Sequence, residues 1–226
     1  SPAPDTAAGL SAQALPERLP PARAEQALTI GNRMLVLPQG RWFGTAASSR
    51  TVLGGHIRVA PVKIDRVELT TLGAFEVTGA GRLAAAVAFT ANKKQAFGIS
   101  YWNVDDPCAS RDGVYVERFN SPFDQPECLR LRVLTPAMMR AVADLQPVLQ
   151  AAEAAGATLP AAAYEVQYAR HGLDWVVTST WLVPTHRLAG DLAAVQWGHA
   201  LANALRPLAR WPQPQTVAAP PLGPMP

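Results

Sequence analysis

The sequence predicts an α+β fold: an antiparallel β-rich N-terminal half followed by a helix, a β-hairpin and a second helix. In several segments of the first half, apolar and polar residues alternate at every second position, as in half-buried strands. Two later segments instead space their apolar residues by three and four positions, as in amphipathic helices. Strands and helices do not alternate along the chain, so a parallel α/β sheet is not expected.

The strand pattern is clearest in residues 64–72 and 128–133. In the second segment, Leu129 and Leu131 flank Arg130. We expect both segments to be half-buried strands of an antiparallel sheet. Weaker strand candidates, separated by Gly, Pro and Asn, are residues 33–38, 41–46, 82–90, 97–103 and 113–119.

Residues 135–156 predict the first helix. Thr135 suits the N-cap, Pro136 the first helical position and Gly156 the C-terminal cap. The apolar residues between them recur at spacings of three and four. Pro147 should kink this helix, because proline removes a backbone donor and clashes with the preceding turn.

A hairpin and a second helix complete the prediction. Residues 162–183 alternate in two arms, and Gly172 supplies the turn, which leaves His171 exposed beside it. In residues 190–211, Asp191 is expected to cap the helix. Its apolar face is formed by Ala194, Trp197, Leu201, Leu205 and Leu208.

Length and composition favour one domain with two tails. The chain has 226 residues, of which 49% are hydrophobic and 16% charged, and no apolar run is long enough to span a bilayer. Five of the 21 prolines lie in residues 1–21 and six in residues 212–226. We therefore expect a Pro/Ala-rich extended tail at 1–24, a single α+β domain at 25–211 and a Pro-rich tail at 212–226.

The two cysteines, Cys108 and Cys128, are interpreted as a disulfide. They lie 20 positions apart with no histidine between them, so neither a zinc site nor a C-x-x-C redox pair is expected. A catalytic cysteine would need a histidine brought near by the fold, which the sequence does not exclude. A disulfide is typical of an oxidising compartment and predicts a periplasmic or extracellular protein.

The first residue is Ser1 rather than methionine, which fits a signal peptide already removed or a chain cut at that point. The net charge of +3 comes from scattered arginines without a basic run, so we expect no nucleic-acid partner.

Polar residues of and near the predicted loop form one candidate site: Asp106, Asp112, His171 and Asp174. Their types suit a hydrolase whose residues converge only in the fold. The acidic spacing does not match a calcium-binding loop, and the four histidines are too dispersed for a metal motif, so no metal is expected. Residues 79–84, GAGRLA, match a dinucleotide-binding pattern, but a hairpin turn explains the glycines, and we expect no cofactor.

Four aromatic residues are the candidate binding surface: Trp42, Phe43, Tyr101 and Trp102. Aromatic side chains anchor many protein interfaces, although core packing would also account for tryptophans.

The leading hypothesis is an exported, non-catalytic accessory protein that binds another component of the cell envelope through its loop or tails. The alternatives are a small exported hydrolase with a dispersed active site and a carrier of an apolar ligand between the sheet and the helices.

Overall fold

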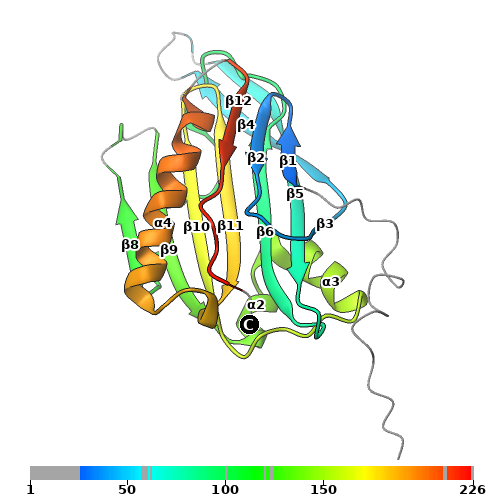
Figure 1. Cartoon of the computed structure of the whole chain (residues 1–226). Helices are drawn as coiled ribbons and strands as arrows, with labels where there is room; N and C mark the ends of the chain where they lie inside the picture. Colours follow the sequence, from blue (N-terminus) through cyan, green and yellow to red (C-terminus); the bar gives the residue numbers. More distant parts are fainter. Residues whose placement is uncertain are drawn as a thin grey trace, which may run out of the picture.

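The computed structural model describes residues 26–56, 61, 63–99, 101–119, 121–122, 125–210 and 213–224. Its main feature is an antiparallel sheet with the strand order β7-β4-β5-β6-β11-β10-β9-β8, in which β3 also pairs with β5 (Figure 1). The predicted α+β class is confirmed. The strands are β3 (Trp42–Gly44), β4 (Ser48–His56), β5 (Lys63–Val77), β6 (Leu83–Asn92), β7 (Tyr101–Trp102), β8 (Tyr115–Arg118), β9 (Glu127–Leu134), β10 (Ala163–His171) and β11 (Val176–Pro184).

One face of this large sheet is covered by a helix and a second, three-stranded sheet. The helix is α4 (Asp191–Leu205), and the small sheet contains β1 (Ala27–Ile30), β2 (Arg33–Val36) and β12 (Gln215–Ala218). Figure 1 shows α4 and the small sheet side by side across β9, β10, β11 and β6. Trp42, Trp181 and Trp197 pack edge to face beneath them, which fixes the large aromatic core of this layer.

The opposite face carries shorter helices: α2 (Pro136–Arg140), the 3₁₀ turn η1 (Ala143–Leu145) and α3 (Gln146–Ala154). They bury an apolar layer that includes Phe43, Phe75 and Leu149. At the other end of this face, Val52, Leu69, Ile99, Trp102 and Val176 form a separate buried cluster. The two apolar layers leave the middle of this face to polar residues.

The first predicted helix is divided into two. Thr135 caps α2 as expected, because its side chain accepts a hydrogen bond from the Met138 backbone N–H. The chain then turns through Val142, which has an extended backbone, and restarts as α3 with Pro147 in the first turn. Pro147 therefore begins a helix rather than kinking one, since the missing proline N–H needs no partner there.

The cap of α4 also differs from the prediction. Gly190, with φ of 94°, is the N-cap, and Asp191 is the first helical residue. The Asp191 carboxylate instead accepts a hydrogen bond of 2.6 Å from the Tyr164 hydroxyl. This bond ties the start of α4 to β10.

The C-terminal boundary of the domain lies beyond residue 211. Residues 215–218 of the predicted tail form β12, which pairs with β2 in parallel. Trp197 Nε1 donates to the Pro221 carbonyl at 3.1 Å, and Arg187 Nε donates to the Gly223 carbonyl at 3.0 Å. These bonds hold the Pro-rich segment against the fold. The predicted N-terminal tail, residues 1–24, lies outside the described residues.

Most of the predicted strands are confirmed, including four of the five weaker candidates: residues 33–38, 41–46, 82–90 and 113–119 contain all or most of β2, β3, β6 and β8. Segments 64–72 and 128–133 lie in β5 and β9, and the two arms of residues 162–183 form β10 and β11. The predicted strand at 97–103 is reduced to the two residues of β7, and β1, β4 and β12 were missed. Within the described part of the chain, no helix has the length and apolarity required to cross a membrane.

Gly73 allows α3 to approach β5 closely. A Cβ at this position would overlap the Val148 side chain and lie 2.7 Å from Thr45 Oγ1. We expect Gly73→Ala to lower the free energy of unfolding by about 1–3 kcal/mol, because overpacking forces neighbouring groups to move. Urea unfolding measures this change. Gly79→Ala is the control, since no heavy atom lies within 4 Å of its added Cβ; equal losses in the two variants would contradict the packing argument.

Candidate functional site

A row of threonines crosses the face of the large sheet that carries α2 and α3. Thr178 of β11 pairs with Thr90 of β6, and Thr90 pairs with Thr71 of β5. Directly paired residues point to the same face, so the three side chains form one row across the sheet. Thr71 Oγ1 and Thr90 Oγ1 lie 2.7 Å apart and share a hydrogen bond. This threonine row lies between the apolar layer under α3 and the cluster around Trp102.

The surface beside the threonine row is hollowed into a groove of about 530 Å³. Its walls include residues 141–144, which link α2 to η1 and begin η1, and residues 104–107, 109 and 110. A smaller hollow of about 180 Å³ shares Arg50 and Asp144 with it and continues toward β4. The polar residues that line the groove are Arg50, Thr90, Asp105, Asp106, Ser110, Arg130, Arg132, Asp144, Glu165, Gln167, His171 and Thr178.

Another hollow, of about 600 Å³, lies among residues 63–68 and 93–97. The side chains that line this hollow are all exposed or half-buried. The groove instead includes the buried side chains of Glu165 and His171, and we take it as the candidate site.

A fully buried carboxylate, Glu165, lies at the floor of the groove. Arg132 donates two hydrogen bonds to it, from Nε to Oε1 at 3.0 Å and from Nη2 to Oε2 at 2.7 Å. Arg130 Nη2 donates a third to Oε1 at 3.1 Å. The register of β9 and β10 places Glu165 opposite Arg132. A buried carboxylate costs several kcal/mol unless it is paired, and here two guanidinium groups pair with one carboxylate.

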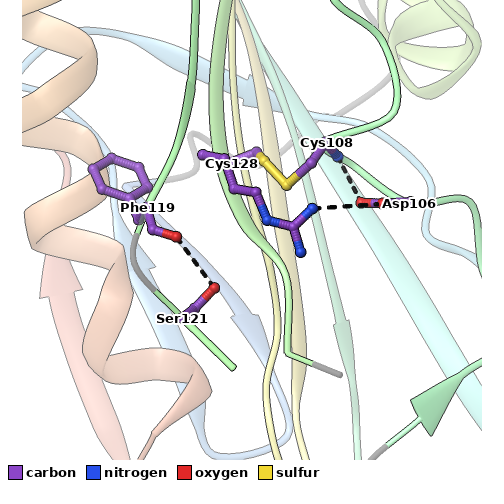
Figure 2. Close-up of a disulfide and its surroundings, with 6 residues drawn as sticks. Asp106, Cys108, Phe119, Ser121 and Cys128 are labelled. Atoms are coloured by element: carbon purple, nitrogen blue, oxygen red, sulfur yellow. Dashed lines mark hydrogen bonds and ion pairs between the residues drawn. A yellow bond between two sulfur atoms is a disulfide. The ribbon is translucent and has the colours of Figure 1, made fainter. Parts of the chain in front are cut away.

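The predicted Cys108–Cys128 disulfide is confirmed. Cys108 lies between the groove-lining residues Pro107 and Ala109, and Cys128 pairs with the groove-lining Ala169. The two Cα atoms are 5.5 Å apart, a normal separation for such a bond. Cys128 lies in β9, so the bond fixes the 104–110 segment to the large sheet (Figure 2). Asp106 accepts a hydrogen bond from the Cys108 backbone N–H at 2.8 Å and lies 3.9 Å from Arg118 Nη1.

His171 lies at the end of β10 and lines the groove. The sequence predicted an exposed side chain in a turn, but His171 is only 6% exposed, because it faces the groove from within the sheet. Burial lowers the pKa of His171 to about 4, and the nearby Asp106 opposes this shift. Among the described residues, neither ring nitrogen of His171 has a hydrogen-bond partner.

The structure brings only part of the predicted polar cluster together. Asp106 and His171 line the same groove. Asp112 is exposed. The pKa of Arg132 is raised mainly by its hydrogen bonds with Glu165, and the charge of Asp112 adds to this shift. Asp174 instead accepts hydrogen bonds from the Gly98 N–H at 2.7 Å and Gln95 Nε2 at 3.0 Å, so it holds the β10–β11 turn against a neighbouring loop.

The predicted aromatic surface is corrected for three of its four residues. Trp42 and Phe43 are buried in the two main core layers, and Trp102 is buried in the third cluster. Trp42 Nε1 donates to the Pro38 carbonyl and Trp102 Nε1 to the Gly172 carbonyl, so burial leaves neither indole N–H unpaired. Tyr101, 52% exposed, is the member that remains open to solvent.

Histidine pairs elsewhere do not form a nucleophilic site. His56 bonds to Asp65 at 2.8 Å, and His199 bonds to Glu117 at 2.6 Å and to Tyr115 at 3.1 Å. Within the described ranges, no histidine hydrogen bond reaches a serine or cysteine, and no group of three His, Cys, Asp or Glu side chains is placed to hold a metal.

Breaking the disulfide should weaken the fold. The bond closes a loop with a separation of 20 residues. We expect the double variant Cys108→Ser, Cys128→Ser to lose about 3 kcal/mol of unfolding free energy in the chain-entropy model. Chemical denaturation measures the loss, and the wild type under reducing conditions should lose a similar amount. Two free thiols detected in the native, oxidised protein would contradict the bond itself.

Acid should destabilise the protein through His171. Unfolded histidine takes up a proton near pH 6.5, whereas the folded pKa of His171 is about 4, so the unfolded state is favoured as the pH falls between these values. Relative to His171→Gln, the wild type should lose about 3 kcal/mol of unfolding free energy between pH 7 and pH 4. The exposed His186→Gln is the control and should follow the wild type. Parallel curves for wild type and His171→Gln would show that His171 titrates normally.

Comparison of the chain with protein-family models, with curated proteins and with solved structures found no match at a significant level.

Proposed function

We propose that the chain is an exported, non-catalytic binding protein whose groove takes a polar segment of another cell-envelope component. The observation that carries this proposal is the groove of about 530 Å³, which is set between two apolar layers and lined by hydroxyl, amide and charged side chains. Ligand sites are concave and orient their ligands through a few converging polar groups. Here those groups include Thr90, Gln167 and Thr178 on three adjacent strands.

Two further features support a rigid binding site. The groups stand on paired strands, which hold side chains more precisely than loops do. The wall formed by the 104–110 loop is fastened to β9 by the Cys108–Cys128 bond. Export is supported by the same bond, since stable disulfides persist mainly outside the reducing cytosol.

The alternatives draw less support from the groove. A hydrolase is favoured by one fact: Ser110, His171 and Asp106 all line it. No hydrogen bond joins His171 to Ser110, however, and the pairing of nucleophile and base is what such chemistry requires. A carrier of an apolar ligand would need an apolar cavity, whereas the floor of this groove carries Glu165 and two arginines.

Native mass spectrometry of the protein, taken gently from its producing cells, tests the proposal. We expect an added discrete mass on the 24.1 kDa chain. Thr178→Trp should remove the added mass, because the large ring fills the centre of the groove. Thr216→Trp, at an exposed position of β12, is the matched control and should retain it.

A bare wild-type chain would count against the proposal, as would an added mass that Thr178→Trp retains. Urea unfolding of both variants confirms that they are folded before the masses are compared.

A further inference from the structure

We propose that the groove recognises an oxyanion on its ligand, a carboxylate, phosphate or sulfate, through Arg130 and Arg132. This inference rests on the proposed function and specifies the chemistry of the same site. Arginine is the side chain best suited to such groups, because its planar fork donates two parallel hydrogen bonds to a pair of oxygens.

The charges on the floor of the groove do not balance. Arg130 and Arg132 together bring two positive charges, and the carboxylate that both contact, Glu165, brings one negative charge. Glu165 is fully buried, and the side chains of Arg130 and Arg132 are only 16% and 27% exposed. A positive charge that has little contact with water and no counter-ion is stabilised when an anion binds beside it.

The two arginines use fewer than half of their N–H donors in hydrogen bonds with Glu165. Each guanidinium has five N–H groups. Arg132 gives Nε and Nη2 to Glu165, and Arg130 gives Nη2 alone. Among the described residues, Arg130 Nε is buried and has no hydrogen-bond partner. Glu165 therefore holds two guanidinium groups side by side. The enclosed Arg130 Nε cannot reach a ligand, so the Nη1 groups, which Glu165 does not engage, are the donors left for one.

Within the described part of the chain, three other carboxylates also line the groove, those of Asp105, Asp106 and Asp144, but none of them forms an ion pair with Arg130 or Arg132. Asp106 is engaged by the Cys108 N–H and lies near Arg118. Desolvation raises the pKa of the Asp144 carboxyl; Arg50 opposes this shift, and Glu165 adds to it. Asp105 and Asp112 are exposed, and water and salt screen exposed charges, although Asp112 still contributes to the raised pKa of Arg132.

The rest of the groove suits an uncharged, hydrogen-bonding part of the same ligand. Thr90 and Thr178 extend from the arginine floor toward β5, and Arg50 stands where the groove continues into the smaller hollow. A ligand with its oxyanion over Arg130 would therefore place its hydroxyl or amide groups along the threonine row.

Titration with inorganic phosphate, sulfate and acetate, followed by NMR of the arginine side-chain N–H groups, tests the inference. We expect at least one of these ions to shift the Arg130 and Arg132 signals in a saturable way. Arg130→Gln should weaken binding about tenfold, because it removes a charge and a fork while Arg132 still pairs with Glu165. Arg140→Gln, on α2 and bound to Glu153, is the control and should bind as the wild type does.

The ion that binds best identifies the charged group of the ligand. Acetate indicates a carboxylate, and phosphate or sulfate indicates a phosphate or sulfate ester. If Arg130→Gln fails to fold, Arg50→Gln, at an exposed position, should still weaken binding several-fold. No saturable shift up to about 50 mM of any ion, or equal binding by Arg130→Gln, would overturn the inference.

The proposed function has a separate readout. If the added mass in native spectrometry depends on Thr178 while no ion binds, the groove binds its ligand without an oxyanion, and only the present inference fails. If the ions bind while no Thr178-dependent mass is found, the proposed function fails instead.

Discussion

The burial of β6 on both faces is the constraint on which the rest of the architecture depends. Every residue of Leu83–Asn92 is buried, so the centre of the large sheet must be covered from two sides. On one side α4 and the small sheet supply that cover, which explains why β12 must return from the far end of the chain to pair with β2. On the other side, α2 and α3 are too short to reach across the strands. The groove is the part of the sheet they leave open.

The rows that no helix covers carry polar side chains, and neighbouring groups bury several of them: Thr90 is 6% exposed and Glu165 is fully buried. Along β6, Ala86 and Ala88 face the helices, and the next residue on that face is Thr90. The same change occurs on β11, from Leu182 under the helices to Thr178 in the groove. On β6 and β11, the residues under the helices and the residues of the groove are therefore consecutive parts of the same strand. The pairing of each strand with its neighbours fixes where both parts lie.

Local patterns allowed most of the large sheet to be predicted, but not the site. Alternation identified β9, β10 and β11, whereas β4 escaped because Ser48–His56 opens with exposed polar residues and contains two glycines. The groove depends on register: Thr71, Thr90 and Thr178 become neighbours only when β5, β6 and β11 pair. The available signal was a threonine within an apolar strand. No local pattern indicates that threonines of different strands lie side by side. His171 was predicted to be exposed but is buried. A residue beside a turn is buried or exposed according to the face of the sheet that it occupies, and the local sequence does not determine that face.

The ionic floor and the disulfide both position groups of the groove, whatever each contributes to stability. A buried ion pair contributes little net stability compared with apolar packing, so the Arg130–Glu165–Arg132 arrangement has no evident advantage for folding alone. A disulfide would constrain the unfolded chain in many places, yet this one fastens a loop wall to β9, two residues from Arg130. Both devices fix the geometry of the same groove. Their coincidence there is the strongest physical reason to regard the groove, rather than the exposed strand edges, as the surface that the fold is built to present.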